Sequence, residues 1–305
     1  MSVPKLADNQ EPVVLTEWQE QGKLESRSAV VWKRFKKNKL AVTGLIVFST
    51  LILMAIFAPL VAPHDPYVNV YEEANLAPSL KHLFGTDSLG GDVFSRVVYG
   101  TRVSLTVALA AMVFTLLIGI TYGAVAGYFG GAVDNVMMRV VDAIQSIPSL
   151  FLLLIIASIV VPSIWTTVFV LSIVGWTGMS RIVRGEILTL KQRDFVEAAR
   201  ATGELKPSII FYHILPNAIA PITVIATLDI AGNILAEAGL SFLGLGIQAP
   251  TPSWGNMLTQ AQDLSTLMTY TWVAIFPGLF ILIAVMSVNF IGDGLRDALD
   301  PRNKN

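Results

Sequence analysis

Long apolar runs alternate with polar segments along most of this chain. The first run, Leu40 to Ala62, has 23 residues and no charged side chain. At a rise of 1.5 Å per residue, such a helix is long enough to cross about 30 Å of bilayer hydrocarbon. The pattern predicts an all-α integral membrane protein with six transmembrane helices, over residues 40–62, 103–128, 138–161, 164–180, 218–240 and 270–291.

The polar segments between these runs predict the topology. Eighteen Lys and Arg residues fall on one predicted side and three, Lys81, Arg96 and Arg102, on the other. Basic residues are retained in the cytoplasm, so both termini are expected there. The predicted cytoplasmic parts are the tail 1–39, the loop 181–216 and the tail 292–305, and the outer loops are 63–102 and 241–269.

The composition supports a membrane protein and excludes several kinds of chemistry. Hydrophobic residues make up 53% of the chain and charged residues only 14%, whereas soluble domains carry about 25% charged residues. The chain has no cysteine, which excludes disulfides, thiolate catalysis and zinc–thiolate sites. The net charge is −1 and the basic residues form no single binding stripe, so we expect no nucleic-acid partner.

Two patterns within the apolar runs concern helix contacts. Gly119, Gly123 and Gly127 are spaced four apart, which lets a neighbouring helix approach closely. Arg139 and Asp142 are three apart and predict an ion pair on one helix face.

The segment from Arg193 to Pro216 is polar and lies between two apolar runs. Asp194 and Glu197 have the spacing of a capping box, which predicts a short helix over Phe195 to Thr202. Gly203 stands where the left-handed residue that ends a helix is usually found. Pro207 can open a second helix, and Pro216 is expected to close it. So short a first helix must be held by the rest of the protein or by a partner.

Three blocks of the sequence resemble one family of transport proteins. Glu197-Ala198-Ala199, then Gly203 and, after eleven residues, Leu215-Pro216, resembles the EAA loop of ABC importer permeases. The block from Phe84-Gly85-Thr86-Asp87 through Asp92, Ser95-Arg96 and Arg102-Ser104-Leu105 is similar to the dipeptide/oligopeptide branch. Leu240 to Gly246 with Pro250 to Trp254-Gly255 resembles the second, C-type subunit. One departure is Gly91, at a position where a basic residue is expected.

The resemblance implies a type I ABC importer permease fold with a cytoplasmic EAA coupling helix, in a bacterial or archaeal cell (inner) membrane. It implies that this helix docks on a cytoplasmic ATPase, with the coupling residues Asp194, Phe195, Glu197, Ala198, Ala199 and Gly203. The implied partners are a homologous B-type permease subunit, two ATPase subunits that bind ATP and Mg, and an extracytoplasmic peptide-binding protein, in addition to membrane lipid. The implied substrate is a peptide, most simply an oligopeptide, with dipeptides, nickel chelates or another small peptide-like solute as alternatives.

Asp229, Asn233 and Glu237 lie at i, i+4 and i+8 in the fifth predicted span. An acid in mid-membrane costs roughly 2.5 to 3.5 kcal/mol, so such residues usually face a cavity or a partner. We expect the three to share a stripe that lines the translocation pathway or pairs across the subunit interface.

Other candidate sites give little support for catalysis. The chain has no GxxxxGK[ST] phosphate-binding loop, and no glycine follows Ser241 at the spacing of a nucleophile elbow. His64, His82 and His213 lack paired-ligand spacing, so we interpret them as separate surface or interfacial side chains and predict no metal site. The sequence therefore predicts a transporter subunit without a cofactor of its own and not an enzyme. A secondary transporter is the first alternative, since intramembrane acids also serve proton relays, and a membrane enzyme is the second.

Overall fold

The computed structural model describes residues 27–300, and every named element in this range is a helix; the predictions that concern residues 1–26 and 301–305 lie outside it. The elements are α2 Arg27–Lys37, α3 Lys39–Ile56, α4 Ala58–Val61, η1 Tyr71–Glu73, α5 Val93–Phe129, α6 Gly131–Gln145, α7 Ser149–Ile159, α8 Ile164–Leu190, α9 Asp194–Ala201, α10 Lys206–Ser208, η2 Ile209–Ile214, α11 Leu215–Phe242, α12 Trp254–Met257, η3 Leu258–Gln262, α13 Leu264–Thr269 and α14 Trp272–Leu299.

Five helical runs in the described residues are long and apolar enough to cross a membrane: α3, α5, α8, the run Lys206–Phe242 and α14. A sixth span would be α6 with α7, which meet at an angle of 81°. The segment predicted as one span over 138–161 is thus not one continuous helix, and its crossing of the membrane stays a prediction. Pro148 stands directly before α7, and proline disfavours the helical conformation of the residue before it, so the chain bends here.

Several helices run past the predicted ends of the spans. α5 begins at Val93, ten residues before the predicted start, because the Asp92 side chain caps it by accepting from the Ser95 amide at 2.8 Å. α8 and α14 continue beyond the predicted limits at 180 and 291. Charged residues mark where a helix leaves the apolar layer, but they do not end the helix.

Pro216 does not close a helix, contrary to the prediction. The backbone is helical from Lys206 to Phe242, first as α10, then as the π-helical turn η2, and then as α11. Pro216 lies in the first turn of α11. The wider π-helical turn directly before it is the kind of local adjustment that accommodates a proline ring within a continuous helix.

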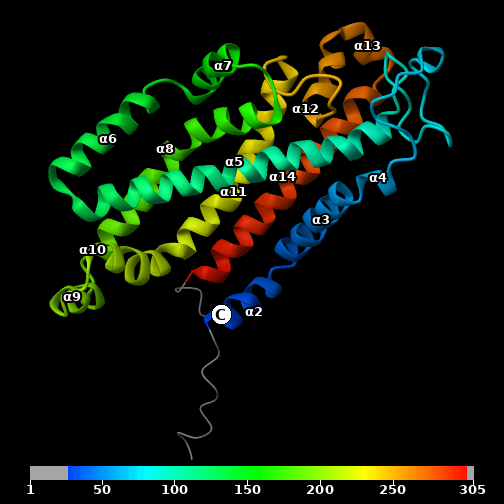
Figure 1. The fold of residues 1–305 in the computed structure, drawn as a ribbon. Coiled ribbons are helices and arrows are strands. Elements are labelled where there is room, and N and C mark those ends of the chain that lie inside the picture. Colours follow the sequence, from blue (N-terminus) through cyan, green and yellow to red (C-terminus); the bar gives the residue numbers. More distant parts are fainter. Residues whose placement is uncertain (1–26, 301–305) are drawn as a thin grey trace, which may run out of the picture.

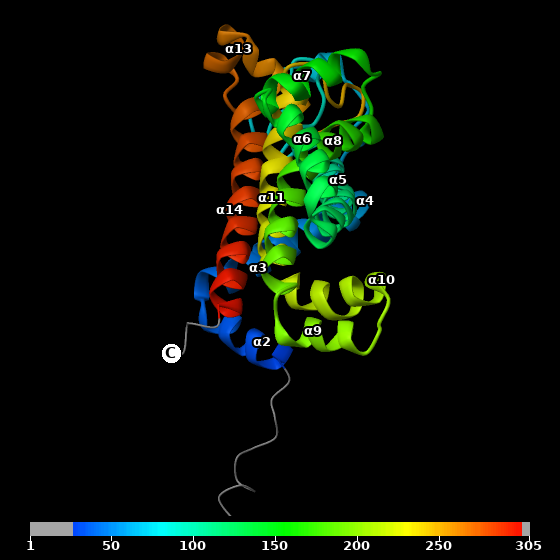
Figure 2. The same ribbon diagram turned by 90° about the vertical axis from the view of Figure 1, so that its left-hand side faces the viewer.

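Among the described helices, α5 and α8 have the most extensive contact, and they lie side by side in Figures 1 and 2. The three spaced glycines of α5 form this contact, as predicted. A Cβ on Gly119 would lie 2.6 Å from Met179 Cβ, and one on Gly127 would lie 2.9 Å from Ile187 Cβ. A Cβ on Gly123 would overlap the Ser180 carbonyl oxygen. A second packed group joins α3, α11 and α14.

Several short elements lie at the two ends of the bundle (Figures 1 and 2). α2, α9 and α10 lie at one end with the last turns of α14, and α7, α12 and α13 lie at the other. α2 is fixed to α14 through buried Phe35, which packs against Gly294, and through the Arg34 guanidinium, which donates to the Asp300 carbonyl at 3.2 Å.

Candidate functional site

The start of α9 differs from the prediction. Arg193 has extended backbone angles and occupies the capping position, without a side-chain cap, so Asp194 is already the first helical residue. The predicted capping box with Glu197 is therefore wrong. Both acids nevertheless lie in the first turn, where the helix dipole favours negative charge.

The end of α9 follows the prediction closely. Gly203 has a φ of +80°, in the left-handed region that favours glycine. Its amide donates to the Arg200 carbonyl at 3.0 Å, and the Glu204 amide donates to the Ala199 carbonyl at 3.2 Å. These bonds satisfy carbonyl groups that the last helical turn would otherwise leave unpaired.

α9 has a buried face and an exposed face. Val196 and Ala199 are buried in a cluster with Ile209, Ile210 and Ile214 of η2, and the same cluster includes Val183 and Ile187 of α8. Asp194, Phe195, Glu197 and Ala198 are exposed. Of the predicted coupling residues, Ala199 thus packs into the protein interior. Asp194, Phe195, Glu197 and Ala198 form an exposed surface that a partner can contact.

Polar contacts attach this region to the end of α5. The Lys191 ammonium donates to the Gly127 carbonyl at 2.8 Å. The Arg200 guanidinium lies over the Tyr128 ring at 5.7 Å, and the Lys206 ammonium lies over the Phe129 ring at 5.5 Å. α9 and the residues beside it are therefore in contact with α5, α8 and the run that leads into α11.

The three polar residues of α11 do not share one exposed stripe. Glu237 is fully buried, and it accepts hydrogen bonds from Ser104 of α5 and from Ser241, both at 2.8 Å. Asp229 and Asn233 are half-buried, and the Asn233 amide approaches the Ala108 carbonyl at 3.4 Å. The structure thus separates Glu237, enclosed within the subunit, from Asp229 and Asn233, whose predicted pathway role stays a prediction.

Two ion pairs join α6 to α8. The Arg184 guanidinium binds both carboxylate oxygens of Asp134, at 2.5 and 2.6 Å. Arg181 binds Asp142 at 2.8 Å. The predicted pair between Arg139 and Asp142 is therefore wrong. Asp142 binds Arg181 of the neighbouring helix α8 and not Arg139 of its own helix α6.

The loop between α4 and α5 is attached to the first turn of α5 through Asp87 of the loop and Arg96 of the helix. Their side chains form an ion pair, and the Asp87 carboxylate also accepts from the Leu89 and Gly91 amides, both at 2.9 Å. The Arg96 guanidinium occupies the space that a side chain at residue 91 would need. This explains why residue 91 is a glycine and not the expected basic residue: the basic group of Arg96 already fills the space beside it.

A pocket of about 600 Å³ opens between this loop and the segment that follows α11. Tyr67, Asn69 and Arg96 line it on one side, and Gln248 and Asn256 line it on the other. The segments that line it lie at the end of the bundle opposite α9 (Figures 1 and 2).

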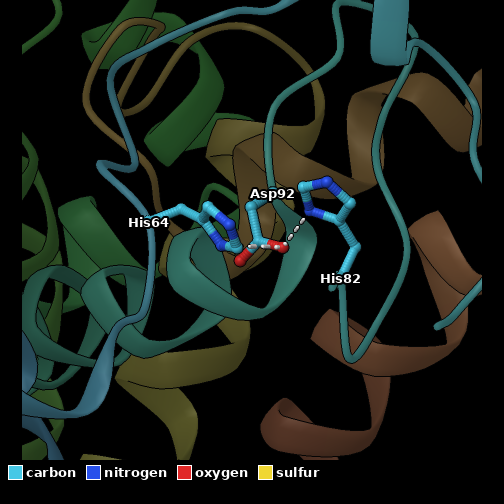
Figure 3. Close-up of side chains that lie close together, drawn as sticks. All are labelled: His64, His82 and Asp92. Carbon is cyan, nitrogen blue, oxygen red and sulfur yellow. Dashed lines mark hydrogen bonds and ion pairs between the residues drawn. The ribbon is translucent and has the colours of Figure 1, made fainter. Parts of the chain in front are cut away.

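The interpretation of the histidines as separate side chains is wrong for two of them. The rings of His64 and His82 stack with centroids 4.8 Å apart, and both face the Asp92 carboxylate (Figure 3). His82 is only 3% exposed. His213 lies in η2, far along the chain, where its Nε2 pairs with the Glu204 carboxylate at 2.9 Å.

Comparison with known families identifies the class of protein. The model for the "binding-protein-dependent transport system inner membrane component" matches residues 119–305, and that for the "N-terminal TM domain of oligopeptide transport permease C" matches residues 26–78. The chain belongs to this family of transporter permeases. The family is one of multi-pass membrane transport proteins, and membership implies a partner permease and ATPase subunits.

Several relatives resemble the permease over most of its length. It is 42% identical to the oligopeptide transport system permease protein OppC of Bacillus subtilis, over 92% of each chain. It is 43% identical to the dipeptide transport system permease protein DppC of the same organism, over 89% of this chain and 84% of that protein. It is 40% identical to the di/tripeptide transport system permease protein DppC of Pseudomonas aeruginosa, over 90% of this chain and 92% of that protein.

A solved structure supports the fold. The permease superposes on a chain of the inward-facing MetNI methionine ABC transporter with a TM-score of 0.55 at 19% identity. The match covers 67% of the permease and 96% of that chain. The expected type I importer permease fold is confirmed.

Proposed function

We propose that this permease is the C-type membrane-spanning subunit of an ATP-driven importer of peptides, with oligopeptides as the first candidate substrate. The observation that carries the proposal is the 42 to 43% identity to oligopeptide and dipeptide permeases over about nine-tenths of the chain. Dipeptides, nickel chelates and other small peptide-like solutes are the alternatives. The chain forms half of a translocation pathway, and a homologous B-type permease forms the other half.

Energy and substrate both come from partners in this proposal. Two cytoplasmic ATPase subunits bind ATP and Mg, since the sequence has no phosphate-binding loop of the P-loop type. An extracytoplasmic peptide-binding protein delivers the substrate to the end of the bundle that carries α12 and α13. Much of the selection among peptides then belongs to that receptor.

The proposed orientation puts α9, α2 and the end of α14 in the cytoplasm of a bacterial or archaeal cell. Support comes from the charge distribution: Lys33, Arg34, Lys36 and Lys37 lie on α2, and Arg193, Arg200 and Lys206 lie on or beside α9. These groups are at the same end of the bundle (Figure 2). Basic residues near spans are retained on the cytoplasmic side.

The exposed face of α9 is the proposed coupling surface. When the ATPase pair closes on ATP, it pushes on Phe195, Glu197 and Ala198, and the buried contacts of Val196 and Ala199 pass this displacement to α8 and η2. The long helices then tilt from an inward-facing to an outward-facing state. Coupling of this kind requires that the two states bind the ATPase dimer with different affinity.

Reconstitution of the complete transporter in lipid vesicles tests the proposal. With receptor outside and ATP inside, we expect accumulation of a labelled oligopeptide that stops when ATP is omitted. A dipeptide assayed in parallel separates the first substrate candidate from its main alternative. Accumulation by the permease pair without any ATPase subunit would overturn the proposal and favour a secondary transporter.

A further inference from the structure

We propose that His64, His82 and Asp92 form a binding site for a divalent transition-metal ion, and that Zn²⁺ matches it best. His64 and His82 belong to the loop that connects α4 to α5, and Asp92 caps the start of α5. One ligand atom from each residue can be chosen so that all three lie within 4.8 Å of one another. Figure 3 shows the Asp92 carboxylate between the two imidazole rings.

The two separations from the Asp92 carboxylate to the histidine nitrogens suit a tetrahedral ion. His82 Nδ1 lies 2.9 Å from Asp92 Oδ1, and His64 Nδ1 lies 3.7 Å from the same oxygen. Ligands bonded to Zn²⁺ at 2.0 to 2.1 Å in a tetrahedron are about 3.3 Å apart, so the two observed distances bracket the ideal value. Small movements of the rings are enough to place an ion between the three atoms.

The two Asp92 oxygens have separate partners. Oδ2 accepts from the Ser95 amide at 2.8 Å, which fixes the carboxylate against the first turn of α5. Oδ1 is the oxygen that both histidines approach. The carboxylate is therefore oriented by the helix and presents one oxygen to the rings.

His82 has the outer contact that is typical of a metal-bound histidine. Its second ring nitrogen, Nε2, lies 3.0 Å from Glu73 Oε2, and the Lys81 ammonium in turn pairs with Glu73. A histidine that binds metal through one nitrogen usually donates its other N–H to a carboxylate, which fixes the tautomer and the ring orientation. Here that arrangement directs Nδ1 to the proposed ion.

His64 supplies the observation that hydrogen bonding alone does not explain. Its Nδ1 is buried and has no hydrogen-bond partner, although buried polar atoms normally have one. The residue is held in place through its backbone amide, which donates to the Ser95 hydroxyl at 3.1 Å. A metal ion bonded to this nitrogen would satisfy it.

The competing interpretation is a network without metal, in which the His82 ring bridges Asp92 and Glu73. That network accounts for both nitrogens of His82 but leaves His64 Nδ1 without a hydrogen bond. The metal site accounts for all three side chains with the same outer carboxylate. Since the His64 side chain is 35% exposed, a water molecule can take the fourth position. The ion would tie the loop from His64 to Asp92 to the first turn of α5.

The test is zinc binding by the complete transporter, purified with a tag that contains no histidine. The complex is treated with a chelator, exposed to Zn²⁺, passed through gel filtration and analysed for bound zinc by mass spectrometry. We compare wild type with two variants. One is His64→Gln, chosen because Nδ1 of His64 makes no hydrogen bond, and the other is His82→Gln. His213→Gln, at the opposite end of the bundle, is the matched control for loss of one histidine.

We expect wild type and His213→Gln to retain one more zinc per complex than His64→Gln and His82→Gln do. Zinc should also raise the melting temperature of wild type but not that of His64→Gln. Glu73→Gln should weaken binding by about 10-fold to 100-fold, as loss of an outer partner does. If folded, monodisperse His64→Gln binds as much zinc as wild type, the cluster is a hydrogen-bonded network and the proposal is wrong.

Discussion

Ser104 of α5 and Glu237 of α11 are 133 positions apart in the sequence, and their side chains hydrogen-bond at 2.8 Å in the interior of the bundle. Ser104 Oγ also accepts from the Trp254 amide at 3.3 Å, and Ser241 donates to the other oxygen of Glu237. The carboxylate thus connects two long helices and the start of α12. This relationship assigns Glu237 a structural role within the subunit.

Replacement of Glu237 should therefore reduce stability. Glu237→Ala leaves the buried Ser104 and Ser241 hydroxyls without their acceptor, at a cost of about 1 to 3 kcal/mol. Glu237→Gln keeps an oxygen acceptor and should lose less. Thermal melting of the purified complex measures both. Asp229→Ala, on the same helix but half-buried, is the control, and an equal melting temperature for Glu237→Ala and Asp229→Ala would contradict the structural role.

Gly123→Ala should destabilise the contact between α5 and α8. The added Cβ overlaps the Ser180 carbonyl, and overpacking of this kind costs about 1 to 3 kcal/mol. Gly185→Ala in α8 is the matched control, since a Cβ there meets nothing within 4 Å. Melting temperature again provides the measurement. Equal effects of the two variants would show that the helices can move apart freely.

Arg184→Ala should cost more stability than Arg181→Ala. The Asp134 side chain that Arg184 binds is 11% exposed, whereas the side chains of Arg181 and Asp142 are 50% and 52% exposed. An exposed pair is worth about 0 to 1 kcal/mol, and removal of one partner from a more buried pair leaves a desolvated charge. Melting temperatures measured in low and high salt distinguish the two ion pairs, because salt should strongly screen only the exposed pair of Arg181 and Asp142. The ranking is wrong if both variants melt alike.

Glu197→Lys should abolish ATP-driven uptake while the permease remains folded in the membrane. The side chain lies on the exposed face of α9, so its charge reversal disturbs the proposed ATPase contact and not the packing of Val196. Co-purification of the ATPase subunits and peptide uptake are measured together. Glu72→Lys, an equally exposed acid at the opposite end, controls for the charge change. Wild-type uptake by Glu197→Lys removes α9 as the coupling element.

Gly203→Pro should release the end of α9. Proline fixes φ near −65°, but the position has a φ of +80°, and the amide that donates to Arg200 is lost. Gly203→Ala keeps the amide and should cost only about 1 to 2 kcal/mol, the penalty of a left-handed conformation for a residue with a Cβ. Limited proteolysis after Arg193 and Arg200 reports the release. Equal protection of the two variants would mean that the left-handed turn is dispensable.

The features that the sequence predicted well depend on neighbours along the chain. Gly203 ends α9 because only a residue without a Cβ adopts the left-handed conformation easily. Gly119, Gly123 and Gly127 share one helix face because of the helical period, so a close contact follows without knowledge of the partner.

The errors arose where a local signal allowed more than one outcome. Pro216 is compatible with the end of a helix or with the first turn after a π-helical turn, and the structure has the second. Arg139 and Asp142 have helical spacing, but Arg181 of α8 lies closer to Asp142. His64 and His82 are 18 positions apart in a loop without periodicity, so no spacing rule could bring them to Asp92.

By itself, the sequence determined a multi-pass helical membrane protein with a short, glycine-ended helix at one end, because hydropathy, helical period and backbone freedom are properties of consecutive residues. Only the tertiary structure decided that Glu237 is enclosed, that α9 buries Val196 and Ala199 while exposing Glu197, and that two histidines meet one carboxylate. These outcomes depend on which helices and loops pack together. Packing is set by the combined burial of many distant side chains, which no short stretch of sequence encodes.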